Sequence, residues 1–186
     1  MTVLVFMVVI IAIVVGVIYN MLVRKRQLVS NGWSDIDVQL KRRSDLIPQL
    51  VSTVQGYAAH ERTLFEEIAQ KRSAAQAAGD DTKARAAAET ALARPVGKLI
   101  AVAEDYPELK ASDQFLELQT QLVETEDKIE MARRFYNGAV RELNTLIESV
   151  PSNLVADALS FTKRDYFEIE ESSRATPSIA EGIKSS

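Results

Sequence analysis

The sequence predicts an all-α membrane protein, in which one N-terminal transmembrane helix is followed by an antiparallel bundle of long helices of the four-helix type. Three observations predict this class. The first 23 residues carry no charged side chain. Two long stretches behind them repeat apolar residues in alternating steps of three and four, the spacing of one helix face. The sequence shows no sustained period-two alternation, the pattern of a half-buried strand. We expect an anchor at residues 1–23, a bundle domain at 24–168 and a disordered tail at 169–186.

Residues 1–23 are long and apolar enough for a membrane span. At about 1.5 Å per helical residue they reach roughly 34 Å, whereas the hydrocarbon core of a bilayer is about 30 Å thick. A cleavable signal peptide is the alternative, but no basic residue precedes the apolar run and no small-residue cleavage site closes it. We therefore expect a retained anchor, with the Tyr19 ring at the level of the lipid headgroups.

Three consecutive cations, Arg24, Lys25 and Arg26, follow the apolar run. Positive residues beside a span resist translocation, so they favour an N-terminus outside and a body in the cytoplasm. An extracytoplasmic body is the alternative topology. The same cations are expected to lie at the membrane interface and to attract anionic lipid headgroups.

The first stretch behind the anchor keeps one apolar face over about 30 residues. Its positions are Val29, Trp33, Ile36, Leu40, Arg43, Ile47, Leu50, Val54 and Tyr57. Pro48 lies inside this stretch and predicts a kink rather than an end. Gly56 is a second weak point, where we expect the helix to bend or stop. Because steps of four and three keep one side in contact with a partner, this stretch predicts a long packed helix.

Two shorter helices are expected next, up to the Asp105-Tyr106-Pro107 break. The first runs to about residue 78, and Gly79 to Thr82 form a turn in which Asp or Thr can cap the following helix. The second spans residues 83–103 and is rich in alanine. Pro95 and Gly97 make it the least regular helix.

The most regular apolar spacing follows, and it predicts a helix of about 52 Å. Its positions are Phe115, Leu118, Leu122, Thr125, Ile129, Ala132, Tyr136, Ala139, Leu143, Leu146 and Val150. A seam of this length needs a long partner, and the first stretch behind the anchor is one. Pro151 ends this helix, and Ser152 is expected to cap a short helix to about Phe161. Tyr166 and Phe167 are expected to fold back onto the bundle.

The distribution of charge argues against nucleic-acid binding. The whole chain has a net charge of −4, but residues 1–45 hold six basic and three acidic side chains, so the remainder is acidic. An acidic body behind a basic stalk does not suit a polyanion. Cysteine is absent from the sequence, which excludes disulfides and thiolate chemistry.

No catalytic, cofactor or metal motif is expected either. His60-Glu61 resembles the start of a zinc-protease motif, but that motif needs a second histidine four residues on, and position 64 is Leu. His60 is the only histidine, so a di-iron bundle site is excluded as well. The sequence has no nucleophile elbow and no phosphate-binding glycine loop. We therefore expect a protein that is not an enzyme.

Polar residues at seam positions form a candidate structural layer. Arg43 stands where an apolar residue is expected, and continuing the count places Glu61 in the same seam. One interpretation leaves both in solvent. A second is a buried polar layer that fixes helix register, and a third is a ligand site. The residues assigned to the layer are Arg43, Glu61, Glu124, Glu126, Arg133 and Asn137, where Glu124 or Glu126 would meet Arg43. Asn137 and Asn144, one heptad apart, are expected to form interhelical hydrogen bonds or to face solvent.

Many of these residues, in this order, resemble the LemA family of bacterial proteins. The residues that carry the resemblance are Tyr19-Asn20, Trp33 to Arg43 (WSDIDVQLKRR), Asp45 to Pro48, Leu50-Val51, Gly56 to Ala58, His60-Glu61, Arg72, Tyr106 to Ala111, Phe115-Leu116, Glu124, Glu126, Ala132-Arg133, Tyr136-Asn137, Asn144 and Pro151. The resemblance covers residues 19 to 168. Two features depart from it. Pro95 brings the continuity of its helix into question, and position 18 is Ile where some similar proteins carry a lipidated cysteine.

The resemblance implies a single-pass protein of the bacterial inner membrane with a helical bundle and no assigned enzyme activity. Because the family includes a magnetosome-associated member, it implies by analogy a scaffold that shapes membrane. We expect a homo-oligomer that organises or deforms the bilayer. The alternative is an adaptor that binds another membrane protein, such as a protease or a transporter. No cofactor is implied.

Overall fold

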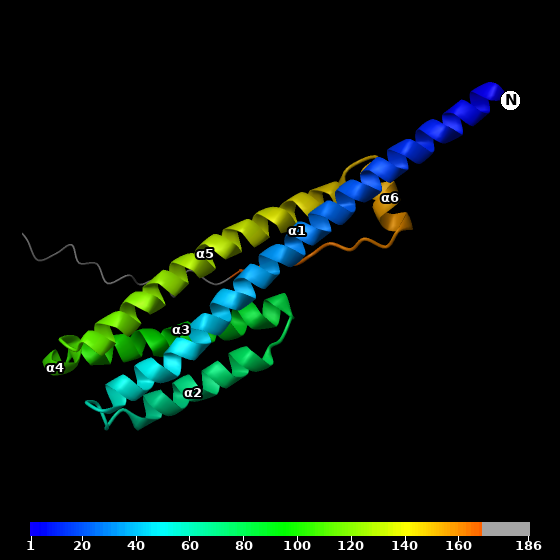
Figure 1. Cartoon of the computed structure of the whole chain (residues 1–186). Coiled ribbons are helices and arrows are strands. Elements are labelled where there is room, and N and C mark those ends of the chain that lie inside the picture. The colour runs from blue at the N-terminus through cyan, green and yellow to red at the C-terminus, as the bar shows by residue number, and fades with distance from the viewer. Residues whose placement is uncertain (169–186) are drawn as a thin grey trace, which may run out of the picture. The chain divides into compact units, whose positions relative to one another are not determined.

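The computed structural model describes residues 1–168, and this part of the chain is folded into six helices without a strand (Figure 1). The helices are α1 (Thr2–Gln55), α2 (Arg62–Ala77), α3 (Thr82–Glu104), α4 (Pro107–Lys110), α5 (Asp113–Glu148) and α6 (Ser152–Ala158). The all-α class with long helices is therefore confirmed. The tail predicted at residues 169–186 lies outside the described residues.

One uninterrupted helix, α1, joins the apolar N-terminal run to the body. Its large apolar side chains from Val3 to Val17 are exposed, whereas Leu22 is fully buried. Among the described residues, α1 is the one helix whose length and composition would let it cross a membrane. It continues through Pro48 and ends just before Gly56, where the sequence predicted a bend or a stop.

The described chain divides into two compact units. Unit 1 consists of Met1–Leu46 and Glu117–Phe167, and unit 2 of Ile47–Leu116. The boundaries predicted for the anchor at 1–23 and the bundle at 24–168 stay predictions.

In unit 1, α1 and α5 pack against each other in antiparallel directions (Figure 1). Three close contacts fix the direction, because residue numbers rise along α1 while they fall along α5. These contacts join Lys25 to Glu142, Gly32 to Tyr136 and Arg43 to Glu126. A Cβ atom on Gly32 would lie only 3.0 Å from the Cα atom of Tyr136. Glycine therefore lets the two backbones approach closely at this point.

In unit 2, α2 and α3 form a helical hairpin. Gly79 makes the turn with φ of +59°, a conformation that costs other residues a steric penalty. The Asp81 side chain caps α3 by accepting a hydrogen bond of 2.9 Å from the Ala84 N–H, as the sequence predicted. Helix α3 is continuous through Pro95, so the interruption that this proline suggested does not occur.

The connection between α5 and α6 differs from its prediction. Ser152 was expected to cap α6, but it is the first helical residue and Pro151 occupies the cap position. The Ser152 hydroxyl instead lies 2.6 Å from the Leu146 carbonyl oxygen and 2.9 Å from that of Ser149. It thus binds the unsatisfied carbonyl groups at the end of α5 rather than amides at the start of α6.

Candidate functional site

The candidate site lies in unit 1, where α1 emerges from the body. This region, called the anchor-proximal end, comprises residues 18–26 of α1 together with residues 150–161. The chain reverses at Ser160, whose φ is +57°, and so brings Phe161 back to α1. The Phe161 ring centroid lies 6.1 Å from that of Tyr19 in an edge-on contact. Protein contacts on α1 therefore begin at the level of Tyr19, and Leu22 is its first buried residue.

The three predicted interface cations have different surroundings. Arg24 is exposed. The Lys25 Nζ atom donates a 2.5 Å hydrogen bond to a carboxylate oxygen of Glu142 in α5. The hydrogen bond and charge of Lys25 lower the pKa of the Glu142 carboxyl from its ordinary value. Arg26 places its guanidinium carbon 5.1 Å from the centroid of the Phe161 ring, a cation–π contact.

An extended segment after α6 runs back along α5, and two asparagines of α5 hold it. This segment, residues 162–167, is called the C-terminal strap. Asn144 accepts from the Arg164 N–H and donates to the Arg164 carbonyl, both at 2.9 Å. Asn137 accepts from the Phe167 N–H at 2.9 Å and donates to the Phe167 carbonyl at 3.1 Å. Each amide therefore pairs with one residue of extended backbone much as a neighbouring strand would.

The spacing of these contacts follows from helix and strand geometry. Asn137 and Asn144 are seven residues apart in a helix, which separates them by about 10.5 Å along its axis. Arg164 and Phe167 are three residues apart in an extended chain, which separates them by about 10 Å. The spacing of the two asparagines along α5 therefore matches the spacing of their two partners along the strap. The predicted roles of the asparagines, interhelical bonding or solvation, are wrong, because both bind the backbone of the strap.

An aromatic cluster closes the end of the strap. Phe167 is fully buried, and its ring lies 5.6 Å from that of Trp33 in an edge-on contact. Trp33 also lies 5.7 Å from the ring of Tyr136, measured between centroids. The Tyr136 hydroxyl donates a 2.9 Å hydrogen bond to the Asp165 carbonyl oxygen. The fold-back that the sequence predicted for Phe167 is confirmed, whereas its neighbour Tyr166 stays exposed.

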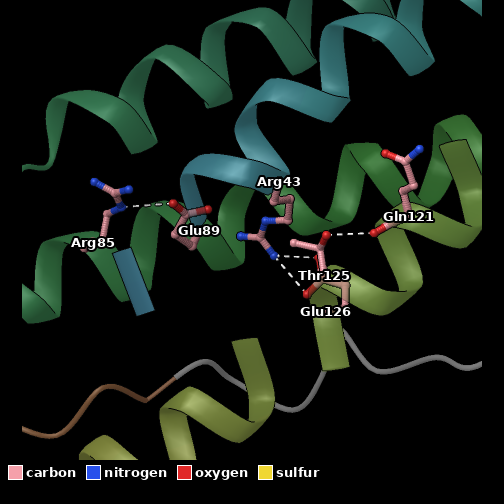
Figure 2. Close-up of polar contacts among 6 residues, drawn as sticks. All are labelled: Arg43, Arg85, Glu89, Gln121, Thr125 and Glu126. Carbon is pink, nitrogen blue, oxygen red and sulfur yellow. Dashed lines mark hydrogen bonds and ion pairs between the residues drawn. The ribbon is translucent and has the colours of Figure 1, made fainter. Parts of the chain in front are cut away.

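Arg43 is buried in the α1 seam and reaches across to α5. Its Nη1 atom donates to both carboxylate oxygens of Glu126, at 2.8 and 3.1 Å (Figure 2). The Glu126 side chain is 47% exposed, so the pair spans from the seam to the surface. Beside it, the buried Thr125 hydroxyl donates to the Gln121 carbonyl at 2.7 Å, which satisfies the one polar residue of the α5 seam.

The remaining residues assigned to the polar layer are not gathered around Arg43. Glu124 is exposed. Arg133 is half-buried, and Asn137 holds the strap. Glu61 lies in the turn before α2, where its side chain makes no capping hydrogen bond. Because α1 ends at Gln55, the heptad count that placed Glu61 in the α1 seam is wrong.

Sequence reasoning missed a buried ion pair in unit 2. The Arg85 Nε atom donates a 3.0 Å hydrogen bond to the Glu89 carboxylate, four residues along α3 (Figure 2). Both side chains are largely buried. The sequence feature that could have revealed this pair is the four-residue spacing of Arg85 and Glu89 in an alanine-rich helix. The same spacing, however, is typical of ion pairs on exposed helix surfaces.

These contacts join protein segments to one another, and no metal centre accompanies them in the described chain. In residues 1–168, no three histidine or carboxylate side chains lie close enough together to hold a metal ion. The most unusual chemical feature of unit 1 is instead the exposed apolar surface of α1 and of the residues around α6. Such surface is suited to contact with lipid or with other protein.

Comparison with known proteins places the chain in a family. Residues 32–180 match the LemA family. The chain is 28% identical to magnetosome protein MamQ 2 of Paramagnetospirillum magneticum, over 87% of this chain and 68% of that protein. It is 25% identical to magnetosome protein MamQ of Magnetospirillum gryphiswaldense, over 89% and 70%. It is 27% identical to protein LemA of Metamycoplasma hominis, over 87% and 74%. The apolar helix and these relatives together indicate a membrane-associated protein, and the chain belongs to the LemA family.

Proposed function

We propose that this chain is a single-pass membrane protein with a non-catalytic role, whose helical body self-associates and scaffolds or remodels the bilayer. The observation that carries the proposal is the continuity of α1. One helix passes from exposed apolar residues into a packed seam without a break. A continuous helix holds the body at a fixed distance and direction from the membrane, which a flexible linker would not do. The relatives named magnetosome protein MamQ agree with a membrane-linked structural role by analogy.

A second apolar face on α5 supports self-association. Val123 and Met131 are both exposed, although their neighbours on the opposite side of the helix are buried. A spacing of eight residues, a little over two turns, places the two on one side of a helix with 3.6 residues per turn. These two residues are called the outer α5 stripe. Phe135 is also exposed, but its ring lies toward α1, because a Cβ atom on Gly32 would lie 3.1 Å from its Cδ1 atom. Contact with a second copy would remove the outer α5 stripe from water, and the second copy is the partner that we propose.

Mass photometry of the full chain in lipid nanodiscs and in mild detergent tests this proposal. The expected result is a multimer that the pair of substitutions Val123→Glu and Met131→Glu reduces to monomer. Val38→Glu is the matched control, because Val38 is an equally exposed valine on α1. A wild-type protein that stays monomeric at every accessible concentration contradicts self-association. Equal dissociation by the control would show that the outer α5 stripe is not the contact.

Crosslinking in cells separates a scaffold from an adaptor. A scaffold gives mainly crosslinks between copies of this chain. An adaptor gives one recurrent foreign membrane protein, such as a protease or a transporter. The adaptor is the alternative function, and such a result would replace self-association by partner binding through the same helical body.

The proposed topology places the N-terminus outside the bacterial inner membrane and the body in the cytoplasm. Arg24 and Arg26 support it, because both are exposed cations beside the apolar part of α1. They are also the groups that would meet anionic lipid headgroups, since Lys25 is engaged by Glu142. Single cysteines in the body, tested with an impermeant thiol reagent on intact and opened cells, determine the side. Labelling of intact spheroplasts would favour the extracytoplasmic alternative.

A further inference from the structure

We infer that the residues around α6 form a second membrane contact, which rests in the headgroup region of the same bilayer that α1 crosses. The inference rests on the proposed anchor. It assigns a surface to the lipid that the sequence pattern did not reveal, because the contacting residues lie about 130 positions beyond the anchor in the chain. Val150, Leu154 and Leu159 are the side chains that we place in the lipid, and they are called the α6 apolar cluster.

The α6 apolar cluster is exposed although the other face of α6 is packed. Val150 is 80% exposed, Leu154 is 67% exposed and Leu159 is 48% exposed. Val155 and Ala156 point into unit 1 and are buried. Single exposed apolar residues are ordinary on a protein surface. Three large ones within ten residues, beside a helix that is itself apolar and exposed, mark a site of contact.

The position of the cluster identifies the bilayer as its occupant. Phe161 contacts Tyr19 and Arg26, which lie on either side of Leu22, the first buried residue of α1. Figure 1 shows α6 beside α1 at this level. The apolar surface of α1 and that of the α6 apolar cluster therefore belong to the same end of unit 1. A surface that continues a membrane span meets the same lipid.

The length of the exposed part of α1 requires the body to approach the bilayer. Exposed large apolar side chains continue to Met21, and in a helix residues 2–21 reach about 30 Å. The hydrocarbon core is also about 30 Å thick. Leu22, which follows directly, therefore lies near the hydrocarbon boundary. Because Leu22 is already fully buried by unit 1, the protein around it sits at headgroup depth.

The charges around the cluster favour insertion driven by apolar contact rather than by anionic lipid. Asp157 is exposed on α6, and it opposes the attraction that Arg24 and Arg26 exert on anionic headgroups. Lys163 and Glu148 pair with each other at 2.6 Å, so their charges largely cancel. We therefore expect the contact to form on zwitterionic bilayers too.

Depth-dependent fluorescence quenching of the full chain in phosphatidylcholine vesicles tests the inference. The wild-type sequence has no cysteine, so one environment-sensitive label can be attached at Leu154→Cys without background labelling. Quencher groups are placed either close to the lipid headgroup or near the end of the acyl chain. The label at position 154 should show a blue-shifted emission and stronger loss of fluorescence with the shallow quencher than with the deep one.

Two further labelled variants make the outcomes distinguishable. Ile10→Cys labels the middle of the exposed part of α1, and Asp127→Cys labels an exposed site on α5 away from the anchor. Quenching at 10 and 154 but not at 127 supports the inference. Quenching at 10 alone overturns the α6 contact and leaves the anchor in place. If position 10 is not quenched either, the proposed anchor itself is wrong.

Discussion

Each unit contains a buried arginine on a helix, but the two arginines bind different kinds of partner. In unit 1, Arg43 of α1 binds Glu126 of α5, which is 83 positions away in the chain. In unit 2, Arg85 binds Glu89 within the same helix. The first pair joins two long helices, whereas the hydrogen bond between Arg85 and Glu89 stays within one helix. A polar group therefore fixes the register of a bundle only when its partner comes from another helix.

The same contrast extends to the other contacts that each unit shows. In unit 1 the strap, the aromatic cluster and the Lys25–Glu142 pair all join segments that are far apart in the sequence. In unit 2 the hydrogen bond of Asp81 is local, like that of Arg85. We infer that unit 1 is held by specific long-range contacts, and four substitutions or conditions test this.

The largest effect is expected from Phe167→Ala, which removes a fully buried ring at the end of the strap. Truncation of a buried phenylalanine costs about 3–5 kcal/mol of unfolding free energy. Denaturant unfolding of the full chain in detergent measures the loss. Tyr166→Ala is the matched control, because the neighbouring ring is exposed. Equal losses for the two variants would show that the strap is not packed in unit 1.

The two arginines should respond differently to removal of their charge. Arg85→Met takes the guanidinium away from Glu89, whose side chain is only 3% exposed, and should cost about 3 kcal/mol. Arg43→Met should cost about 1 kcal/mol, because the Glu126 carboxylate is half exposed and keeps its contact with water. The combined variant Arg85→Met with Glu89→Leu should recover most of the stability. A larger loss for Arg43 than for Arg85 would reverse the comparison.

Loss of one asparagine should loosen the strap without unfolding unit 1. Asn144→Ala removes two hydrogen bonds to Arg164, and a hydrogen bond is worth about 1 kcal/mol. Amide hydrogen exchange should become faster at Arg164, while the amide of Phe167, held by Asn137, changes less. Asn137→Ala should give the opposite pattern. If either variant speeds amide exchange equally at Arg164 and Phe167, the strap opens as one cooperative unit and the two asparagines do not act independently.

The smallest effect concerns pH and the Lys25–Glu142 pair. Lys25 lowers the pKa of the Glu142 carboxyl in the folded protein, so the pair stabilises the fold above the unfolded pKa of that carboxyl. This contribution is lost as the pH falls through the lowered folded value. The Tm difference between wild type and Glu142→Gln should therefore be present at neutral pH and vanish in acid. A difference that persists in acid would mean that packing, rather than charge, accounts for it.

Helix positions were largely predictable because apolar spacing records which face is buried. The seam from Val29 to Val54 and the α5 seam from Phe115 to Leu143 are mostly buried, and Gly56 and Pro107 stand where helices end or begin. The last predicted position of the α5 seam, Val150, is wrong, because it lies beyond the end of α5 and is 80% exposed. Apolar spacing and helix-ending residues depend only on neighbouring positions in the chain, so they can be found from the sequence alone.

The contacts of the strap were not predictable, because they depend on chain reversal after α6. An asparagine on a helix surface has the same sequence appearance whether it faces water or an extended backbone. The strap has no periodicity of its own. The role of Ser152 was mistaken for a related reason, since a serine at a helix start can bind either the next amides or the preceding carbonyls.

The most direct test of the account is whether the full chain stays in the membrane through α1. Membranes from producing cells are washed with alkaline carbonate, and the retained protein is examined by intact-mass and N-terminal peptide analysis. We predict that the protein remains in the pellet and still carries residues 2–23. Release into the supernatant, or a mature protein that begins after Tyr19, would contradict the account.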